Sequence, residues 1–197
     1  LEQDEKNDFR EYFSGQYTSW LGQPWFYSIA NSPVSDPFIG YMHTSPLVPE
    51  VLVRQAYAEG FLTMSGSKCM QYVILGAGLD TFSFRNSNPG LLVYEVDRKE
   101  VADFKMSRAT SLRGTPGRAP VYVPMNLGAD NLPSRLLNAG LKRHLPTVVS
   151  CLGLTPYLTA TSLQETLSAL RGVMCESSVV VFDYTLPKAL NANDGCP

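Results

Sequence analysis

The sequence is poor in the side chains that bind metal ions or build disulfide frameworks. Among its 197 residues it has four cysteines and two histidines, namely Cys69, Cys151, Cys175, Cys196, His43 and His144. No two cysteines form a C-x-x-C pair, whereas a structural zinc site needs four ligands at short spacings, so no metal is expected. Such sparse cysteine usage also indicates reduced thiols, and we therefore expect a cytoplasmic protein.

Net charge and long apolar runs are also scarce. The chain has 16 basic and 18 acidic side chains, a net charge of -2. It therefore lacks the bulk positive field that holds phosphate backbones or anionic lipid, and no nucleic-acid partner is expected. The two longest uncharged stretches, 14–35 and 145–164, contain proline and polar residues. Neither has the pattern of a membrane-spanning helix, so no membrane partner is expected either.

What the chain does contain is typical of one folded unit, with 44% apolar and 17% charged residues. Its first third is unusual, because Asp36 is the only charged residue between Tyr12 and Pro49, and nine of the 21 aromatic residues lie there. We interpret residues 1–69 as a helical, aromatic-rich cap. Its rings either pack on the main body or cover an apolar substrate pocket.

After residue 70, short apolar runs alternate with helical patterns, which is typical of βα units around a parallel sheet. Strands are expected at 72–75, 91–96, 121–123, 147–151 and 179–182. Helices are expected at 50–64, at 99–112 with Val101 and Phe104 among the residues at helical spacing, at 130–139, and from a capping box at 161–164 to Gly172. The predicted fold class is α/β, with a Rossmann-like sheet in residues 70–197 that has helices on both faces and packs with the cap as one unit.

The most informative segment is a buried strand that runs into a glycine turn at Gly76 and Gly78. Glycines there permit a tight turn and the close approach of a ligand to the backbone. The third glycine of the dinucleotide motif is absent. We expect Asp80 in the first turn of the next helix, where a carboxylate would repel a pyrophosphate. A ligand with a cationic centre, such as S-adenosylmethionine, suits this turn better than a nicotinamide dinucleotide does.

An acidic side chain follows the glycine turn at the spacing along the chain that is typical of a ribose-binding carboxylate. Asp97 lies nineteen residues after Gly78, at the end of the second expected strand. A carboxylate in that place can accept hydrogen bonds from both ribose hydroxyls of a nucleoside. Glu95 lies two residues before Asp97 on the same expected strand, so both side chains point to the same face of the sheet, and the alternation of faces does not show which of them binds the ribose. We choose Asp97 because it is nearer the carboxyl edge of the sheet; the alternative is a solvated loop group or a helix cap.

Several motifs together resemble one family, the leucine carboxyl methyltransferases. Residues 71–81, QYVILGAGLDT, are similar to the family's Q-x-V-x-L-G-A-G-L-D-T signature, and residues 94–97 are similar to its E-V-D motif. Residues 153–159 and 180–184 resemble the segments after its fourth strand and at its fifth. The resemblance implies a class I O-methyltransferase of the small-molecule or polyketide branch, with S-adenosyl-L-methionine as cofactor.

The resemblance also implies cofactor contacts beyond Asp97. The turn Gly76-Ala77-Gly78 would bind the cofactor, and Arg54 would pair with its carboxylate, the alternative being a surface arginine. The segment Asn126-Leu127 would hold the adenine.

The sequence departs from the family pattern at two positions. Many members have Asp-Leu where this chain has Asn126-Leu127, although an asparagine oxygen can still accept from the adenine amine. Many also have a glutamate where this chain has Leu152. The resemblance further implies two C-terminal strands that the 197 residues do not supply, so we interpret the chain as a fragment.

Methyl transfer to oxygen needs alignment more than acid–base chemistry, because a carboxylate acceptor is already ionised. His43, Tyr157 and Asp183 are conceivable bases for a hydroxyl acceptor, each with an equally good structural role, and His144 lies at the wrong edge of the sheet. No catalytic residue is assigned. We expect an enzyme that methylates a small molecule; the alternatives are a non-catalytic binding protein of the same fold and, less favoured, an NAD-dependent oxidoreductase.

Overall fold

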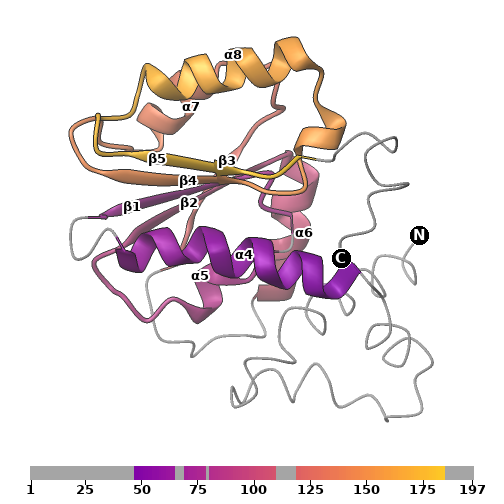
Figure 1. The fold of residues 1–197 in the computed structure, drawn as a ribbon, viewed down its shortest axis with the longest axis vertical. Coiled ribbons are helices and arrows are strands. Elements are labelled where there is room, and N and C mark those ends of the chain that lie inside the picture. Colours follow the sequence, from indigo (N-terminus) through magenta and orange to yellow (C-terminus); the bar gives the residue numbers. More distant parts are fainter. Residues whose placement is uncertain (1–46, 65–68, 79, 110–118, 185–197) are drawn as a thin grey trace, which may run out of the picture.

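The protein contains a five-stranded, all-parallel sheet with the strand order β3-β2-β1-β4-β5 (Figure 1). The computed structural model describes residues 47–64, 69–78, 80–109 and 119–184. The strands are β1 (Gln71–Leu75), β2 (Leu92–Asp97), β3 (Val121–Pro124), β4 (Thr147–Cys151) and β5 (Val179–Phe182). Every strand predicted from the sequence is present, with boundaries that shift by one residue at most.

Helices cover both faces of the sheet, as the alternation of strands and helices requires. They are α4 (Leu47–Met64), α5 (Phe82–Arg85), α6 (Lys99–Ala109), α7 (Leu132–Asn138) and α8 (Ala160–Arg171), with a short 3₁₀ helix, η3 (Thr155–Tyr157). Figure 1 shows α7 and α8 on one face, here called the upper face, and α4, α5 and α6 on the lower face. The predicted α/β Rossmann-like architecture is confirmed.

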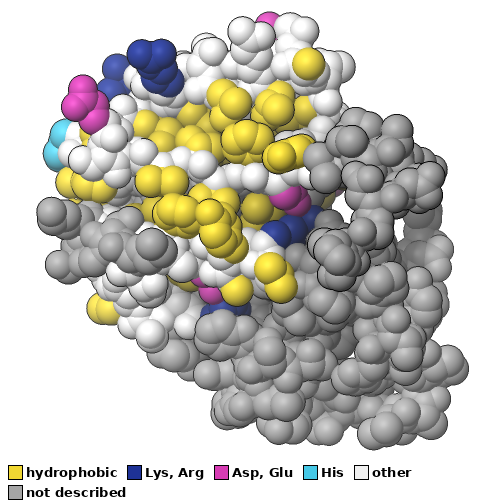
Figure 2. Space-filling model, viewed as in Figure 1, with side chains coloured by type: hydrophobic (Ala, Val, Ile, Leu, Met, Phe, Trp, Pro, Cys, Tyr) yellow, Lys and Arg dark blue, Asp and Glu magenta, His cyan; other side chains and the backbone are white. Residues whose placement is uncertain are grey.

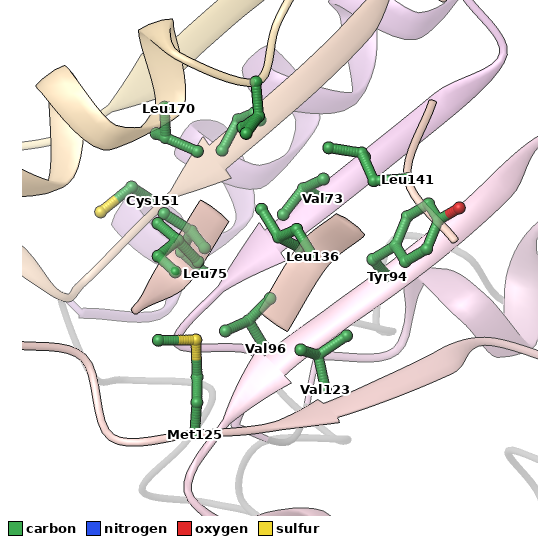
Figure 3. Packing of buried hydrophobic residues seen from close by; sticks show 13 residues of the cluster. Val73, Leu75, Tyr94, Val96, Val123, Met125, Leu136, Leu141, Cys151 and Leu170 are labelled. Atoms are coloured by element: carbon green, nitrogen blue, oxygen red, sulfur yellow. The ribbon is translucent and has the colours of Figure 1, made fainter. Parts of the chain in front are cut away.

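The upper face holds an apolar core. Val73 and Leu75 of β1 point to this side and pack with Val96 of β2, Leu136 of α7 and Leu170 of α8. Leu136 lies at the centre of the labelled side chains and is fully buried (Figure 3). Polar side chains meet at the amino end of the strands, where the side-chain amide of Gln71 donates to Thr147 Oγ1 at 2.9 Å.

The lower face holds a second cluster in which buried charges lie among the apolar groups. Tyr72 and Ile74 of β1 pack there with Phe82 of α5. Beside them Lys105 of α6 forms an ion pair with Glu95 of β2, 2.6 Å from Nζ to Oε2, with both side chains 2% exposed or less. Such a pair is tolerated in a core because each charge compensates the other.

The structure adds one detail to a predicted helix and corrects another. Among residues 99–107 of α6, Ala102 and Lys105 are buried, whereas Val101 and Phe104 are half-buried, and Lys105 is held inside by its ion pair with Glu95. The predicted capping box at 161–164 was wrong, because α8 begins before it, at Ala160. The N-cap of α8 is Thr159, whose hydroxyl accepts from the N–H of Ser162 at 3.1 Å.

Strand β5 forms one edge of the sheet among the described strands. Figure 2 shows apolar side chains gathered on the face that carries β5 and α4, and Val53, Tyr57, Phe182 and Tyr184 are exposed. Within the described ranges, no helix has the length and apolar character needed to cross a membrane. The predicted aromatic cap, apart from α4, lies outside the described residues, as does His43.

Candidate functional site

The strand order places a candidate site at the carboxyl edge of the sheet. Strands β1 and β4 are neighbours, but the chain leaves β1 towards β2 on one side and leaves β4 towards β5 on the other. The loops that follow β1 and β4 therefore diverge at their shared edge. In open α/β sheets ligands bind outside the carboxyl ends of the strands at such a switch point.

The glycine turn stands at this point and is fixed to the neighbouring strand. The backbone N–H groups of Gly76 and Ala77 both donate to the carbonyl oxygen of Val96, at 2.9 and 3.1 Å. Gly76 and Gly78 have φ angles of 66° and 45°, in the left-handed region that glycine enters without a steric penalty. Among the described residues, a Cβ on Gly78 would meet only the carbonyl oxygen of Gly76, at 3.9 Å, so the backbone at Gly78 has room for an approaching ligand.

Asp97 lies directly against this turn. Its Oδ2 accepts from the N–H of Gly78 at 2.7 Å, and its Oδ1 accepts from the N–H of Arg98 at 2.7 Å. Glu95, by contrast, is buried on the lower face with Lys105 and with the hydroxyl of Ser83, which donates to it at 2.5 Å. The structure therefore separates the two carboxylates that sequence parity left equivalent, and only Asp97 lies at the carboxyl edge.

The expectation for Asp80 was wrong. It precedes α5 instead of lying in its first turn, and it is buried, with Gln55 Nε2 and the N–H of Phe82 donating to its two oxygens at 2.8 and 2.7 Å. Burial raises the pKa of its carboxyl group to about 6. Since Asp80 faces the protein interior, its charge is no direct argument against a phosphate ligand at the turn.

Arg54 and Asp183 meet at the same edge, although 129 residues separate them. Nη1 of Arg54 lies 2.9 Å from Oδ2 of Asp183, and the N–H of Gly153 donates to both carboxylate oxygens at 2.8 and 2.9 Å. Gly153 has a φ of 66°, and a Cβ there would lie 2.8 Å from Nη2 of Arg54. The positive φ and this close approach therefore favour glycine where α4 and the ends of β4 and β5 come together.

The loop after β4 also contacts the glycine turn, since the side chain of Leu154 would lie 3.2 Å from a Cβ on Gly76. The Arg54–Asp183 pair, through Gly153, and the glycine turn, through Leu154, thus both lie next to the loop after β4. Sequence reasoning named Arg54 and Asp183 separately and missed their pairing. The chain offered no signal for it beyond the position of Asp183 directly after the fifth predicted strand.

Asn126 and Leu127 follow β3 at the same edge. The N–H of Asn126 donates to Oδ2 of Asp130 at 2.8 Å, its side chain is exposed, and Gly128 turns the chain with a φ of 92°. Leu127 packs partly against the upper core. The loop after β2 joins this region, because the N–H of Met125 donates to the carbonyl oxygen of Asp97 at 2.8 Å.

The remaining candidates for chemistry are weak. Tyr157 is 84% exposed, and His144 lies before β4 at the amino edge. Burial raises the pKa of the Cys151 thiol to about 11, so it is protonated at neutral pH and is a poor nucleophile. In the part of the chain that the structure describes, no three His, Cys, Asp or Glu side chains are grouped to hold a metal ion.

A hollow of about 610 Å³ lies elsewhere, between α4 and α5. Its lining includes Glu59, Thr63, Phe84 and Arg85, together with Leu91, which precedes β2. Glu59 and Arg85 already form a two-point ion pair with each other there. Because this hollow is on the amino side of the sheet, it does not belong to the site at the glycine turn.

Comparison with known proteins gives a family and a fold. A model of the leucine carboxyl methyltransferase family matches residues 25–171. A protein of Mycolicibacterium gilvum is 30% identical over 88% of this chain and 58% of its own length. A protein of Bacillus subtilis is 36% identical over 70% of this chain and 46% of its own length. Both are provisionally named S-adenosyl-L-methionine-dependent methyltransferases.

The chain spans about half the length of the curated relatives that it matches. Among solved structures, one from Thermobifida fusca, provisionally named a methyltransferase, superposes with a TM-score of 0.50 at 17% identity, over 72% of this chain and 57% of that one. At that identity the likeness shows the fold alone.

Proposed function

The chain belongs to the leucine carboxyl methyltransferase family, and we propose that it transfers a methyl group from S-adenosylmethionine to a carboxylate or hydroxyl oxygen of a small molecule. The observation that carries this proposal is the contact between Asp97 and Gly78, 2.7 Å from Oδ2 to N. It joins an acidic side chain to an open glycine turn at the switch point of a parallel sheet, where this fold binds nucleoside ligands.

The residues at the carboxyl edge fit such a cofactor. Asp97 has the acceptors for two ribose hydroxyls, and the turn Gly76-Ala77-Gly78 lets the ligand approach its backbone at Gly78. Arg54 has the planar, forked donor set that suits the carboxylate of the amino-acid end. Asn126 and Leu127 stand at the end of β3, where the exposed amide of Asn126 is available to an adenine ring.

The cofactor supplies the reactive group, a methyl on a positively charged sulfur that leaves as a thioether when the acceptor oxygen attacks in line. The protein has to orient the two reactants and keep water away. A carboxylate acceptor reaches this site already ionised and needs no base. For a hydroxyl acceptor, Asp183 is a poor base, because its carboxylate is already engaged by Arg54 and by the N–H of Gly153.

Three further assignments remain part of the proposal. Residues 1–69 act as a cap on the cofactor domain of residues 70–197, which the packing of Phe61 and Leu62 of α4 against the lower cluster supports. The partner is a small-molecule methyl acceptor. A reducing compartment such as the cytoplasm suits the thiols of Cys69, Cys151 and Cys175, which are unpaired.

Titration calorimetry with S-adenosylhomocysteine tests the proposal. Asp97→Ala should weaken binding about 10- to 100-fold, the equivalent of about 1.5 to 3 kcal/mol for lost hydrogen bonds to a charged acceptor. Asp103→Ala is the matched control, because Asp103 is an exposed carboxylate on α6 whose partner is Lys99. An absence of binding at millimolar ligand, or an Asp97→Ala variant with unchanged affinity, would contradict the proposed site. Binding without transfer to any tested acceptor would favour the non-catalytic alternative.

A further inference from the structure

Asp80 closes the glycine turn with its backbone and joins the turn to two helices with its side chain. Its N–H donates to the carbonyl oxygen of Ala77 at 2.7 Å. Its carboxylate accepts from Nε2 of Gln55 on α4 at 2.8 Å and from the N–H of Phe82, the first residue of α5, at 2.7 Å. Asp80 therefore connects the turn directly to the helix that carries Arg54.

The contact between Gln55 and Asp80 is buried, because the two residues are only 6% and 7% exposed. A hydrogen bond to an ionised carboxylate is short and directional, and a buried partner left without it loses free energy. On α4, Gln55 is the neighbour of Arg54, which lies at the carboxyl edge with Asp183. A shift of Gln55 relative to Asp80 therefore moves Arg54 relative to the glycine turn.

Protonation of Asp80 would change this contact. Oδ1 accepts from the N–H of Phe82, whose backbone is fixed in α5, so we expect a proton on Oδ2, which faces Nε2 of Gln55. Two donors, the O–H of Asp80 and the N–H of Gln55, would then face each other. Either the two groups separate or the amide of Gln55 turns over, and both changes alter how α4 meets the turn.

The surroundings of Asp80 bring this protonation close to neutral pH. Charged and titratable side chains come from every element around it: Glu59 of α4, Tyr72 of β1, Arg85 of α5, Glu95 of β2 and Lys105 of α6. Burial raises the pKa of Asp80 to about 6, although Lys105 and the N–H at the start of α5 act to lower it. Glu59 and Glu95 have cationic partners, whereas the two donors to Asp80 are neutral.

We propose that Asp80 and Gln55 are positioning residues of the cofactor site: the hydrogen bond that ionised Asp80 accepts from Gln55 holds α4, and with it Arg54, in place against the glycine turn. This role rests on the proposed function. It gives cofactor binding a pH response, because affinity falls when Asp80 takes up a proton. The contribution of Asp80 to stability has the opposite sign, since the folded chain holds that proton more tightly than the unfolded one. Affinity and this contribution therefore change in opposite directions as the pH falls.

Titration calorimetry with S-adenosylhomocysteine at pH 7.5 and pH 5 tests the proposal. About one tenth of Asp80 is ionised at pH 5, so the unmodified chain should bind about 10-fold more weakly there than at pH 7.5. Asp80→Asn puts a permanent donor opposite Gln55. It should bind more weakly than the unmodified chain at pH 7.5, and its affinity should differ by less than about 3-fold between the two pH values.

Tyr72→Phe is the matched control. It removes another buried hydrogen bond on the lower face, from the hydroxyl of Tyr72 to Oγ of Ser150 at 2.9 Å, which involves neither α4 nor the glycine turn. This variant should retain the 10-fold response. A response lost in Tyr72→Phe as well as in Asp80→Asn would overturn the assignment to Asp80, because any damage to the lower face would then have the same effect.

A double-mutant cycle tests the contact itself. Gln55→Met and Asp80→Asn remove the same hydrogen bond, so at pH 7.5 the double variant should bind no more than about 2-fold more weakly than the weaker of the two single variants. Losses that multiply would show that the two residues act separately, which contradicts a shared positioning role.

The remaining outcomes separate this role from the proposed function. Affinity of the unmodified chain that is constant or rises from pH 7.5 to pH 5 would overturn the positioning role, and this measurement stands even if Asp80→Asn does not fold. A full response that persists in Asp80→Asn would overturn it too, because another group would then be titrating. An absence of binding at both pH values would instead overturn the proposed function, and the positioning role with it.

Discussion

The two faces of the sheet are built on different physical principles. The upper face packs Val73, Val96 and Leu136 in an apolar core, with a hydrogen bond between Gln71 and Thr147 at the amino end of the strands. The lower face buries the ion pair of Glu95 and Lys105 among aromatic rings. Burial of an apolar group stabilises through its area, so damage there scales with the volume removed. Burial of a charge is tolerated only with its partner, so damage there depends on which partner is lost.

The difference also concerns function. The lower face ties the elements that lead to the carboxyl edge: Gln55 of α4 donates to Asp80, and Ser83 of α5 donates to Glu95 of β2. A directional hydrogen bond fixes how two elements meet, whereas apolar contacts permit small shifts. We expect the lower face to determine the position of α4, and with it that of Arg54, more than the upper face does.

The largest effect should come from removing one buried charge on the lower face. Lys105→Met leaves Glu95 unpaired, and we expect the free energy of unfolding to fall by about 4 kcal/mol. The double variant Glu95→Leu/Lys105→Met should recover all but about 1 to 2 kcal/mol, because neither charge then remains buried. Urea unfolding followed by circular dichroism measures both. A double variant as unstable as the single one would show that the pair does not act through charge.

The next largest effect should come from the upper face. Leu136→Ala should lower the free energy of unfolding by about 3 kcal/mol, because the truncated side chain leaves a cavity at the centre of the apolar core. The same urea titration measures the change. Leu136→Met nearly conserves volume and should lose less than about 1.5 kcal/mol. If the two substitutions cost the same, packing density would not be what stabilises this face.

A smaller effect should appear in the pH dependence of the free energy of unfolding, to which Asp80 on the lower face contributes. Burial raises the pKa of Asp80 to about 6 from 3.8, so between those values the folded protein holds a proton that the unfolded chain has released. The contribution of Asp80 to stability is therefore fully present below pH 4 and is lost as pH rises through 6. Between pH 7 and pH 5 the unmodified chain should gain about 1 kcal/mol relative to Asp80→Asn.

Unfolding titrations of both proteins at the two pH values measure this difference. Leu136→Ala is a suitable comparison, because a change on the upper face should leave the pH dependence as it is. A constant difference between the unmodified chain and Asp80→Asn from pH 7 to pH 5 would contradict a buried, protonatable Asp80.

The smallest effect should come from a charge pair that is exposed. Lys99 and Asp103 form an ion pair one turn apart on α6, the helix that also carries Lys105. Asp103→Ala should leave the thermal midpoint unchanged within error, because solvent screens an exposed pair. If Asp103→Ala destabilised the protein as much as Lys105→Met does, the stabilisation of the lower face would come from charges on α6 in general and not from the burial of the Glu95–Lys105 pair.

Sequence reasoning predicted the strands better than the details of the helices. The strands are continuous apolar runs, which need no knowledge of the neighbouring elements to be recognised. The buried face of α6 depends on a partner instead: Lys105 is inside only because Glu95, on a strand that precedes α6, supplies the opposite charge. Thr159 was missed as the cap of α8 because several hydroxyl residues precede that helix and only the backbone decides which of them caps it.

The sequence by itself determined the sheet, the glycine turn and the family. Apolar runs and turn glycines act through local backbone preferences, and these can be read in the chain without its fold. Only the tertiary structure decided between Glu95 and Asp97, turned Asp80 inward, and brought Asp183 to Arg54 across 129 residues. Each of these outcomes depends on which side chains meet after the strands pair. Charge and hydrogen-bond complementarity act over a few ångströms in space, whatever the separation along the chain.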